Sequence, residues 1–202
     1  MVDERSIVDY DEDTVLVVVD MQNDFTHPDG SLYVDEGEEV VPLINTEIRA
    51  ALQDDALVVF TQDWHPESTP HFEKDGGIWP VHCVGGTWGA EFYDGLDVPD
   101  DAPVVKKGVD GGDGYSAFSV RDPESGEEEA TELGAILDGH GIEHVVTVGL
   151  AQDYCVKETV LDALRAGYET TLLTDLTRPV DLEEGDGARA LEEMEGAGAE
   201  LR

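Results

Sequence analysis

Five short apolar runs rich in β-branched residues recur along the chain, with room for a helix between successive runs. They lie at Thr14–Val19, Leu57–Thr61, Pro103–Lys106, His144–Val148 and Thr170–Thr174. Continuous runs of this kind are typical of strands that are buried on both faces of a parallel sheet. A short last strand is predicted at Ala199–Arg202.

Between these strands, apolar residues return at helical spacing. The stripes are formed by Val41, Ile44, Ile48 and Leu52, by Leu133, Ile136 and Leu137, and by Val156, Val160 and Leu164. Gly141 and Gly167 are placed to end the second and third helices, and an acidic helix is predicted over roughly Leu182–Glu195. The alternation predicts an α/β fold, a single doubly wound parallel sheet of about six strands with helices on both faces.

The chain shows no repeat, low-complexity linker or compositional break. We therefore expect one domain over residues 14–202, preceded by an acidic N-terminal extension over residues 1–13. The long connection from Asp63 to Pro99 has little periodicity, and connections of that length in a compact domain are usually functional. Because ligands bind at the carboxyl ends of strands in such sheets, the strand ends are where chemistry is expected.

The charge balance changes the picture of possible partners. The 202 residues include 48 Asp+Glu against 11 Lys+Arg, which gives a net charge of −37. This excludes nucleic-acid binding by phosphate neutralisation and disfavours docking on anionic membranes. The acids are spread through every segment and only four residues are lysine, a pattern typical of proteins kept soluble in concentrated salt. We therefore predict a halophilic source, with an ordinary acidic cytosolic protein as the alternative; a homo-oligomer stays open.

The N-terminal sequence and the cysteine count bear on location. Met1–Arg5 has neither the basic region nor the apolar region of a signal peptide, and no stretch approaches the ~20 apolar residues of a membrane span. The two cysteines, Cys83 and Cys155, are too few for a disulfide scaffold. These features predict a soluble, cytoplasmic protein.

Three reactive side chains stand at predicted strand ends. Asp20 could serve as a general base, and Lys107 could stabilise developing negative charge. Cys155 is expected in the first turn of a helix, where the dipole and free N–H groups would stabilise a thiolate and an oxyanion. Side-chain alternation sends only one of Lys106 and Lys107 into the site. A capping aspartate, a surface lysine pair and a buried structural cysteine stay open as alternatives.

A second cluster of chemistry lies in the long connection after the second strand. Asp63 and His65, together with His71 and His82, offer a carboxylate and imidazoles that fit zinc, iron(II) or manganese with positions left open. The alternative is that these histidines hydrogen-bond loop backbone. Cys83, His140 and His144 are interpreted as structural.

These segments together resemble the nicotinamidase branch of the isochorismatase-like cysteine hydrolases. The matching stretches, which follow one another in order over most of the chain, are VVVDMQNDF, TQDWHP, HF, WPVHCV, KKG, GYSAF and GLAQDYCVKET. The resemblance implies an isochorismatase-like fold, a catalytic triad and one divalent metal ion, zinc in the first place with iron or manganese as alternatives. The implied triad is Asp20, Lys107 and Cys155, and the implied metal ligands are Asp63, His65 and His82, with His71 joining in some members only.

The resemblance also implies how the substrate is held and converted. Backbone N–H groups of Ala151 and Cys155 would form the oxyanion hole beside a cis peptide at Leu150–Ala151, and an aromatic pocket would be lined by Phe25, Trp79 and Tyr115. The implied reaction is hydrolysis of nicotinamide to nicotinate and ammonia, a step of NAD salvage, through a cysteine thioester. The alternatives are a related amidohydrolase acting on an N-carbamoyl or ureido compound, and a non-catalytic protein that binds metal or nicotinamide. The acidic, glycine-rich loop 108–114 departs from the family pattern and leaves the substrate range open.

The evenly acidic composition predicts that the folded protein depends on concentrated salt. At molar KCl the Debye length is about 3 Å, so repulsion between carboxylates is screened, and we expect the melting temperature to rise from low salt to molar KCl. Circular dichroism melts across a KCl series measure this. A protein that is no less stable at low salt than at molar salt would contradict the halophilic origin.

Overall fold

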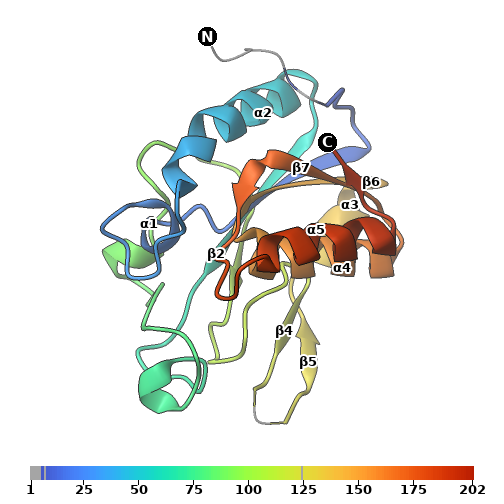
Figure 1. Ribbon diagram of the computed structural model, residues 1–202. Coiled ribbons are helices and arrows are strands. Elements are labelled where there is room, and N and C mark those ends of the chain that lie inside the picture. The colour runs from blue at the N-terminus through green and yellow to red at the C-terminus, as the bar shows by residue number, and fades with distance from the viewer. Residues whose placement is uncertain (1–5, 7, 124) are drawn as a thin grey trace.

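The computed structural model describes residues 6, 8–123 and 125–202 and has a central parallel sheet with helices on both faces (Figure 1). The strands are β1 Thr14–Val19, β2 Leu57–Asp63, β3 Val104–Lys107, β4 Ser119–Arg121, β5 Glu128–Ala130, β6 His144–Leu150, β7 Glu169–Arg178 and β8 Glu200–Leu201. Six of them form the sheet in the order β3-β2-β1-β6-β7-β8, and every neighbouring pair is parallel. β4 and β5 form a separate antiparallel hairpin.

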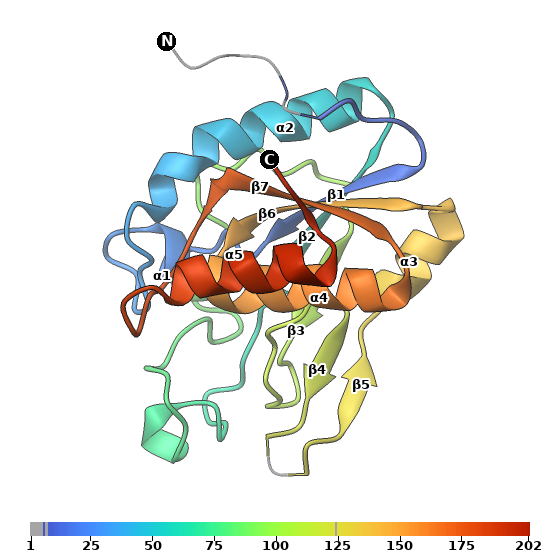
Figure 2. The ribbon, with the colours of Figure 1, turned by 45° about the vertical axis from the view of Figure 1, so that its right-hand side comes forward.

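The helices divide between the two faces of the sheet. The α-helices are α1 Asn23–Thr26, α2 Val41–Gln53, α3 Leu133–His140, α4 Lys157–Ala166 and α5 Asp186–Ala197, with short helical turns η1 Gly37–Val40, η2 Glu73–Asp75, η3 Trp88–Ala90 and η4 Gln152–Val156. Leu16 and Val18 of β1 pack in the core under α2, whereas Val15 and Val17 pack toward α3, α4 and α5 (Figure 2). β1 is thus covered on both sides, as its apolar run predicts. No helix among the described residues is both long and apolar enough to cross a membrane.

The predicted fold class is confirmed, and two local expectations need correction. The last helix begins at Asp186 rather than near Leu182, because Gly185 precedes it with a left-handed backbone and the Asp153 carboxylate accepts hydrogen bonds from the N–H groups of Val180 and Asp181. These bonds fix the backbone of the segment that precedes the helix, in which Asp181 has a positive φ. The β4–β5 hairpin was not expected, because its second strand is wholly exposed and lacks an apolar alternation.

The described part of the predicted N-terminal extension packs on α2. Val8 and Tyr10 are buried in the core, and the Tyr10 hydroxyl donates a hydrogen bond to Glu47 at 3.0 Å. Burial, reinforced by the Glu47 carboxylate, raises the pKa of Tyr10. Residues 1–5 and 7 of this extension lie outside the described part of the chain.

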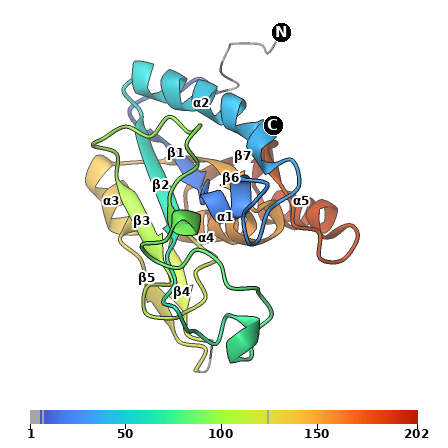
Figure 3. The ribbon, with the colours of Figure 1, turned by 90° about the vertical axis from the view of Figure 1, so that its left-hand side faces the viewer.

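The topology marks one end of the sheet for chemistry. β1 lies between β2 and β6, so the order of the strands reverses beside it, and ligands in such sheets bind at the carboxyl ends next to this reversal. The long connection from β2 to β3 and the β4–β5 hairpin both extend from that end (Figure 3). The strand ends and these two segments therefore form the walls of any site there.

Candidate active site

Four chemically active side chains meet at the carboxyl ends of neighbouring strands. Asp20 directly follows β1, Asp63 is the last residue of β2, and Lys107 is the last residue of β3. Cys155 follows β6, in the turn that leads into α4. All four are buried, and Asp20 and Lys107 have no exposed surface. The sheet thus brings together the acid, the amine and the thiol that the sequence places at its strand ends.

Lys107 and Asp20 form a fully buried ion pair. The Lys107 ammonium donates to Asp20 Oδ2 at 2.6 Å and to the carbonyl oxygens of Gly114 and Tyr115 at 2.5 and 3.1 Å. The hydroxyl of Thr61 donates to Asp20 Oδ1 at 2.5 Å. Burial raises the pKa of the Asp20 carboxyl, although the charge of Lys107 opposes this rise. Burial by itself would lower the pKa of the Lys107 amine, but the Asp20 carboxylate outweighs that effect and raises it. Asp20 is therefore a carboxylate with a stronger affinity for a proton than usual.

Cys155 differs from its expected setting in one respect. It lies in η4, a π-helical turn that precedes α4, and not in the first turn of an α-helix. Burial raises the pKa of the Cys155 thiol well above its usual value, and the nearby carboxylates of Asp20 and Asp63 add to this, although the charge of Lys107 opposes it. The Cys155 thiol hydrogen-bonds the Asp20 carboxylate, which is placed to accept its proton, and the thiolate at this position stays a prediction.

Beside this triad, Asp63 and three histidines form a second buried cluster. His65, His71 and His82 offer ring nitrogens that all lie within 4.8 Å of one another. Asp63 Oδ2 lies 3.2 Å from His65 Nε2 and 3.4 Å from His82 Nε2. The structure therefore brings together all four residues that the resemblance assigns to the metal, including His71.

The hydrogen bonds around this cluster fit a bound divalent metal. The Nδ1 atom of His71 is bonded to Asp113 and that of His82 to the Pro80 carbonyl, so both Nε2 atoms are free to face the cluster. Asp63 Oδ1 is buried without a hydrogen-bond partner. Burial by itself would raise the pKa of the Asp63 carboxyl. His65, His82 and Lys107 outweigh this effect and hold that pKa well below its usual value. One carboxylate and three imidazoles are a donor set that suits zinc, iron and manganese.

A small pocket lies over both clusters. Its lining residues are Phe25, Leu32, Asp63, His71, Trp79, His82, Tyr115, Ala151, Tyr154, Cys155 and Val180. The indole N–H of Trp79 donates to the Tyr115 hydroxyl at 2.8 Å, and its ring meets that of Tyr154 edge-on with centroids 4.8 Å apart. The pocket thus contains the expected Phe25, Trp79 and Tyr115, whereas Leu32, Tyr154 and Val180 were not foreseen. Tyr154 directly precedes Cys155, which is a signal that sequence reasoning could have used.

Two polar residues after β1 fix the backbone of the metal cluster. Gln22 donates from its side chain to the Asp63 carbonyl at 2.7 Å and accepts from the Asp63 N–H at 2.8 Å. Asp24 accepts from the Cys83 N–H at 2.7 Å, directly after His82. Neither residue was foreseen, because the partners are distant in sequence. The one available signal was the dense run of polar residues at a buried strand end.

Glycines bring the unusual loop 108–114 close to the site. Gly108 has φ 74, and a Cβ there would fall 2.7 Å from the imidazole of His65. A Cβ at Gly114 would fall 2.7 Å from Asp63 Oδ1 and 2.9 Å from the Cβ of Lys107. The absence of side chains at these two positions lets the backbone pass between the triad and the metal cluster, where Gly114 also accepts a hydrogen bond from Lys107.

The residues interpreted as structural lie in settings without reactive partners. Cys83 is fully buried, and burial raises the pKa of its thiol well above the usual value. His140 is bonded to the Ile136 carbonyl in the last turn of α3, and His144 to the Thr171 hydroxyl at the amino end of β6. The Leu150–Ala151 peptide bond is cis, as the resemblance implies.

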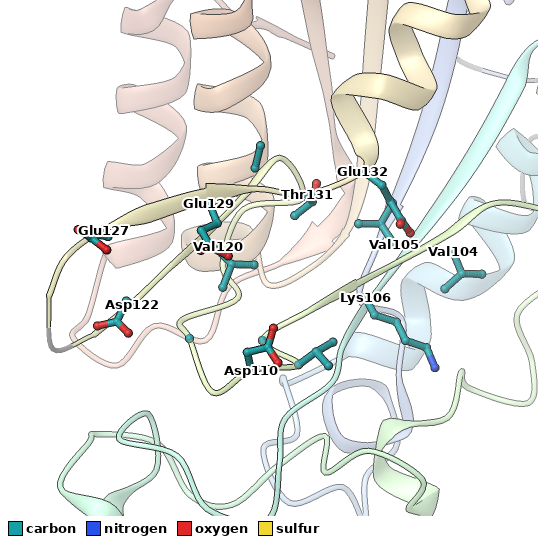
Figure 4. Close-up of a pocket in the computed structure, with 14 residues that line it drawn as sticks. Val104, Val105, Lys106, Asp110, Val120, Asp122, Glu127, Glu129, Thr131 and Glu132 are labelled. Atoms are coloured by element: carbon teal, nitrogen blue, oxygen red, sulfur yellow. The ribbon is translucent and has the colours of Figure 1, made fainter.

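A larger hollow of about 590 Å³ lies elsewhere, between β3 and the β4–β5 hairpin (Figure 4). It is lined by carboxylates of Asp110, Asp122, Glu127, Glu129 and Glu132, and shares no lining residue with the small pocket. No histidine or cysteine lines it. The reactive groups therefore belong to the small pocket.

Comparison with known proteins identifies the family of the chain. Residues 14–202 match the model of the isochorismatase domain. A nicotinamidase of Escherichia coli is 37% identical over 202 residues, covering 92% of each chain. The structure of pyrazinamidase of Pyrococcus horikoshii in complex with zinc is 41% identical with a TM-score of 0.83, covering 94% of this chain and 98% of that one. The structure of PnC1 from L. infantum in complex with nicotinate is 36% identical with a TM-score of 0.85, covering 96% and 95%.

The adjacent lysines give a matched test of the buried ion pair. Lys107→Met leaves the Asp20 carboxylate buried without its counter-charge, and we expect a loss of about 3–5 kcal/mol in the free energy of unfolding. Lys106 is exposed and its ammonium lies 3.4 Å from the centroid of the Trp64 ring, so Lys106→Met is expected to cost about 0.5–1 kcal/mol. Urea unfolding at fixed salt measures both. Equal losses in the two variants would contradict the assignment of Lys107 to the site.

Proposed function

The chain belongs to the isochorismatase family, and from this premise we propose that it is a nicotinamidase, which hydrolyses nicotinamide to nicotinate and ammonia. The observation that carries the proposal is the contact between a buried acid, a buried amine and a thiol that lines the small pocket, beside a carboxylate–histidine cluster. The relatives' names and the nicotinate complex of a structure 36% identical to this chain support the choice of substrate.

In the proposed reaction, Cys155 is the nucleophile and Asp20 moves its proton. As the thiol proton passes to Asp20, Sγ forms a bond to the amide carbon, and the amide oxygen takes up negative charge. Backbone N–H groups of Ala151 and Cys155 hold that oxygen, each such donor contributing roughly 3–4 kcal/mol. When the carbon–nitrogen bond breaks, Asp20 returns the proton to the departing ammonia and a thioester remains.

The second half of the reaction uses the same groups. Asp20 accepts a proton from a water molecule as the water oxygen attacks the thioester carbon. The carbon–sulfur bond then breaks and Asp20 returns the proton to Sγ, while the acid that forms releases its remaining proton to water and leaves as nicotinate. Lys107 stays charged throughout and donates one hydrogen bond to the Asp20 carboxylate, while the carbonyl oxygens of Gly114 and Tyr115 accept two more and hold the ammonium in place. Its role is to keep Asp20 ionised despite burial.

The metal cluster and the aromatic residues would hold the substrate. Asp63, His65, His71 and His82 would bind one divalent ion, zinc in the first place, which supplies a Lewis-acid centre for the pyridine nitrogen when bound. Phe25 and Trp79 would hold the ring between them, and the Trp79–Tyr115 hydrogen bond fixes one wall of the pocket.

The two cysteines separate the nucleophile from a structural thiol. Cys155→Ala removes the atom that forms the thioester, so we expect ammonia release from nicotinamide to fall by several orders of magnitude while bound metal is retained. Cys83→Ala is the matched control, because Cys83 is buried outside the pocket, and it should keep its turnover. Ammonia release at molar KCl, with metal analysis of each sample, measures both. Turnover near that of the wild type in Cys155→Ala would remove this residue from the role.

Metal removal tests the second half of the proposal. We expect chelation to abolish ammonia release from nicotinamide, and added zinc, manganese or iron(II) to restore it, because the substrate ring loses its anchor. Elemental analysis before and after chelation shows which ion the protein carries. Full turnover in a sample shown to be metal-free contradicts the metal role. No turnover in a folded, metal-loaded sample would discard nicotinamide and direct the search to carbamoyl and ureido amides.

A further inference from the structure

His71 is the member of the metal cluster with the least direct contact to Asp63. His65 and His82 each place Nε2 within 3.4 Å of an Asp63 oxygen, and no such distance joins Asp63 to His71 among the described contacts. His71 instead directs Nδ1 to Asp113 Oδ1 at 2.6 Å. The side chains of His71 and Asp113 are 4% and 23% exposed, so the contact is largely shielded from water. The orientation of His71 thus depends on a residue outside the cluster.

The backbone of Asp113 is fixed by the neighbouring hairpin. Its N–H donates to the Arg121 carbonyl at 2.7 Å, and the Arg121 N–H donates to the Asp113 carbonyl at 3.2 Å, which adds an antiparallel bridge at the end of β4. The same loop is joined to the segment that carries His71, because the Thr69 hydroxyl donates to the Gly111 carbonyl at 2.6 Å. Two long loops are therefore cross-linked at the point where Asp113 meets His71.

The consequence for His71 follows from the chemistry of a neutral imidazole. An imidazole that donates Nδ1–H to a carboxylate has its lone pair on Nε2, and the carboxylate raises the basicity of that nitrogen. The ring of His71 stacks on that of His65 with centroids 4.7 Å apart, which directs it into the cluster. His82 is held in the same way by the Pro80 carbonyl, an uncharged acceptor. Among the three histidines of the cluster, only His71 has Nδ1 hydrogen-bonded to a carboxylate in the described contacts.

We propose that Asp113 is a positioning residue that makes His71 a ligand of the metal ion, through a carboxylate–histidine–metal arrangement. The inference rests on the metal site of the proposed function and adds a residue to it. It also gives the acidic, glycine-rich loop 108–114 a purpose: Gly112 and Gly114 flank the one acid of the loop that contacts the cluster, whereas Asp110 is exposed. Asp113 sets how tightly the ion is held and does not touch the substrate.

The test measures metal affinity, with zinc as the probe. Removal of an outer partner of this kind weakens binding about 10–100-fold, so we expect that increase in the zinc Kd of Asp113→Ala, measured by competition with a chromophoric chelator. Asp113→Asn keeps an oxygen that can accept from Nδ1–H, and its Kd should fall between those of Asp113→Ala and the wild type. Asp110→Asn, in the same loop, is the matched control and should leave the Kd unchanged.

A double-mutant cycle separates a positioning role from a general effect on the loop. In a His71→Ala background, Asp113→Asn should cause no further loss of zinc affinity, because the group it orients is gone. The visible absorption of cobalt(II)-loaded protein should also change alike in His71→Ala and Asp113→Ala, because each loses the same ligand. An unchanged zinc Kd in Asp113→Ala, or an equal further loss in the His71→Ala background, overturns the inference.

Failure of this inference and failure of the proposed function give different experimental results. A protein whose zinc affinity depends on Asp113 but which releases no ammonia from nicotinamide keeps this inference and loses the function. A protein that turns over nicotinamide with a zinc Kd indifferent to Asp113 keeps the function and loses this inference. A folded wild type that binds neither zinc nor cobalt overturns both.

Discussion

The buried ion pair between Lys107 and Asp20 is the interaction on which the rest of the site depends. Asp20 directly follows β1 and Lys107 ends β3, so the pair spans β2, which lies between them in the sheet. Neighbouring strands are about 4.8 Å apart, and only a long side chain can cross two such spacings. Thr61, on the intervening β2, completes the crossing with its hydrogen bond to Asp20. The ion pair therefore connects the ends of β1 and β3 across β2 and holds the three parallel strands in register.

Two properties of the site follow from this pairing. Lys107 is shared between Asp20 and two backbone carbonyls, and its charge lowers the pKa of the Cys155 thiol by less than burial raises it, so that pKa lies well above its usual value. The metal cluster, by contrast, holds Asp63 ionised through its histidines. The site therefore contains a carboxylate with a raised pKa, Asp20, and a carboxylate with a lowered pKa, Asp63. This separation supports the proposed roles, which are proton transfer for Asp20 and metal binding for Asp63.

Sequence reasoning reached the parts of the molecule that a local pattern determines. The apolar runs predicted β1 and β6 because a strand buried on both faces leaves a continuous signature, and the strand ends led to the reactive side chains because topology places chemistry there. It missed Thr61, Gln22 and Asp113 for a common physical reason. Each is a polar residue whose role is a hydrogen bond to a partner about 40 residues away, and no local periodicity encodes such a contact.

The acidic composition hides these residues further. In a chain with 48 Asp+Glu, an aspartate in a loop gives no signal by its presence, and Asp110 and Asp113 look alike in the sequence. They differ only in that Asp113 meets an imidazole and is held by a strand end, whereas Asp110 faces solvent. The same holds for Asp24, which fixes the backbone beside His82, and for Asp153, which fixes the segment before α5. In this protein a functional acid is recognised by the hydrogen-bond donors that surround it. The number of acidic residues alone reports only on the charge of the solvent-facing surface.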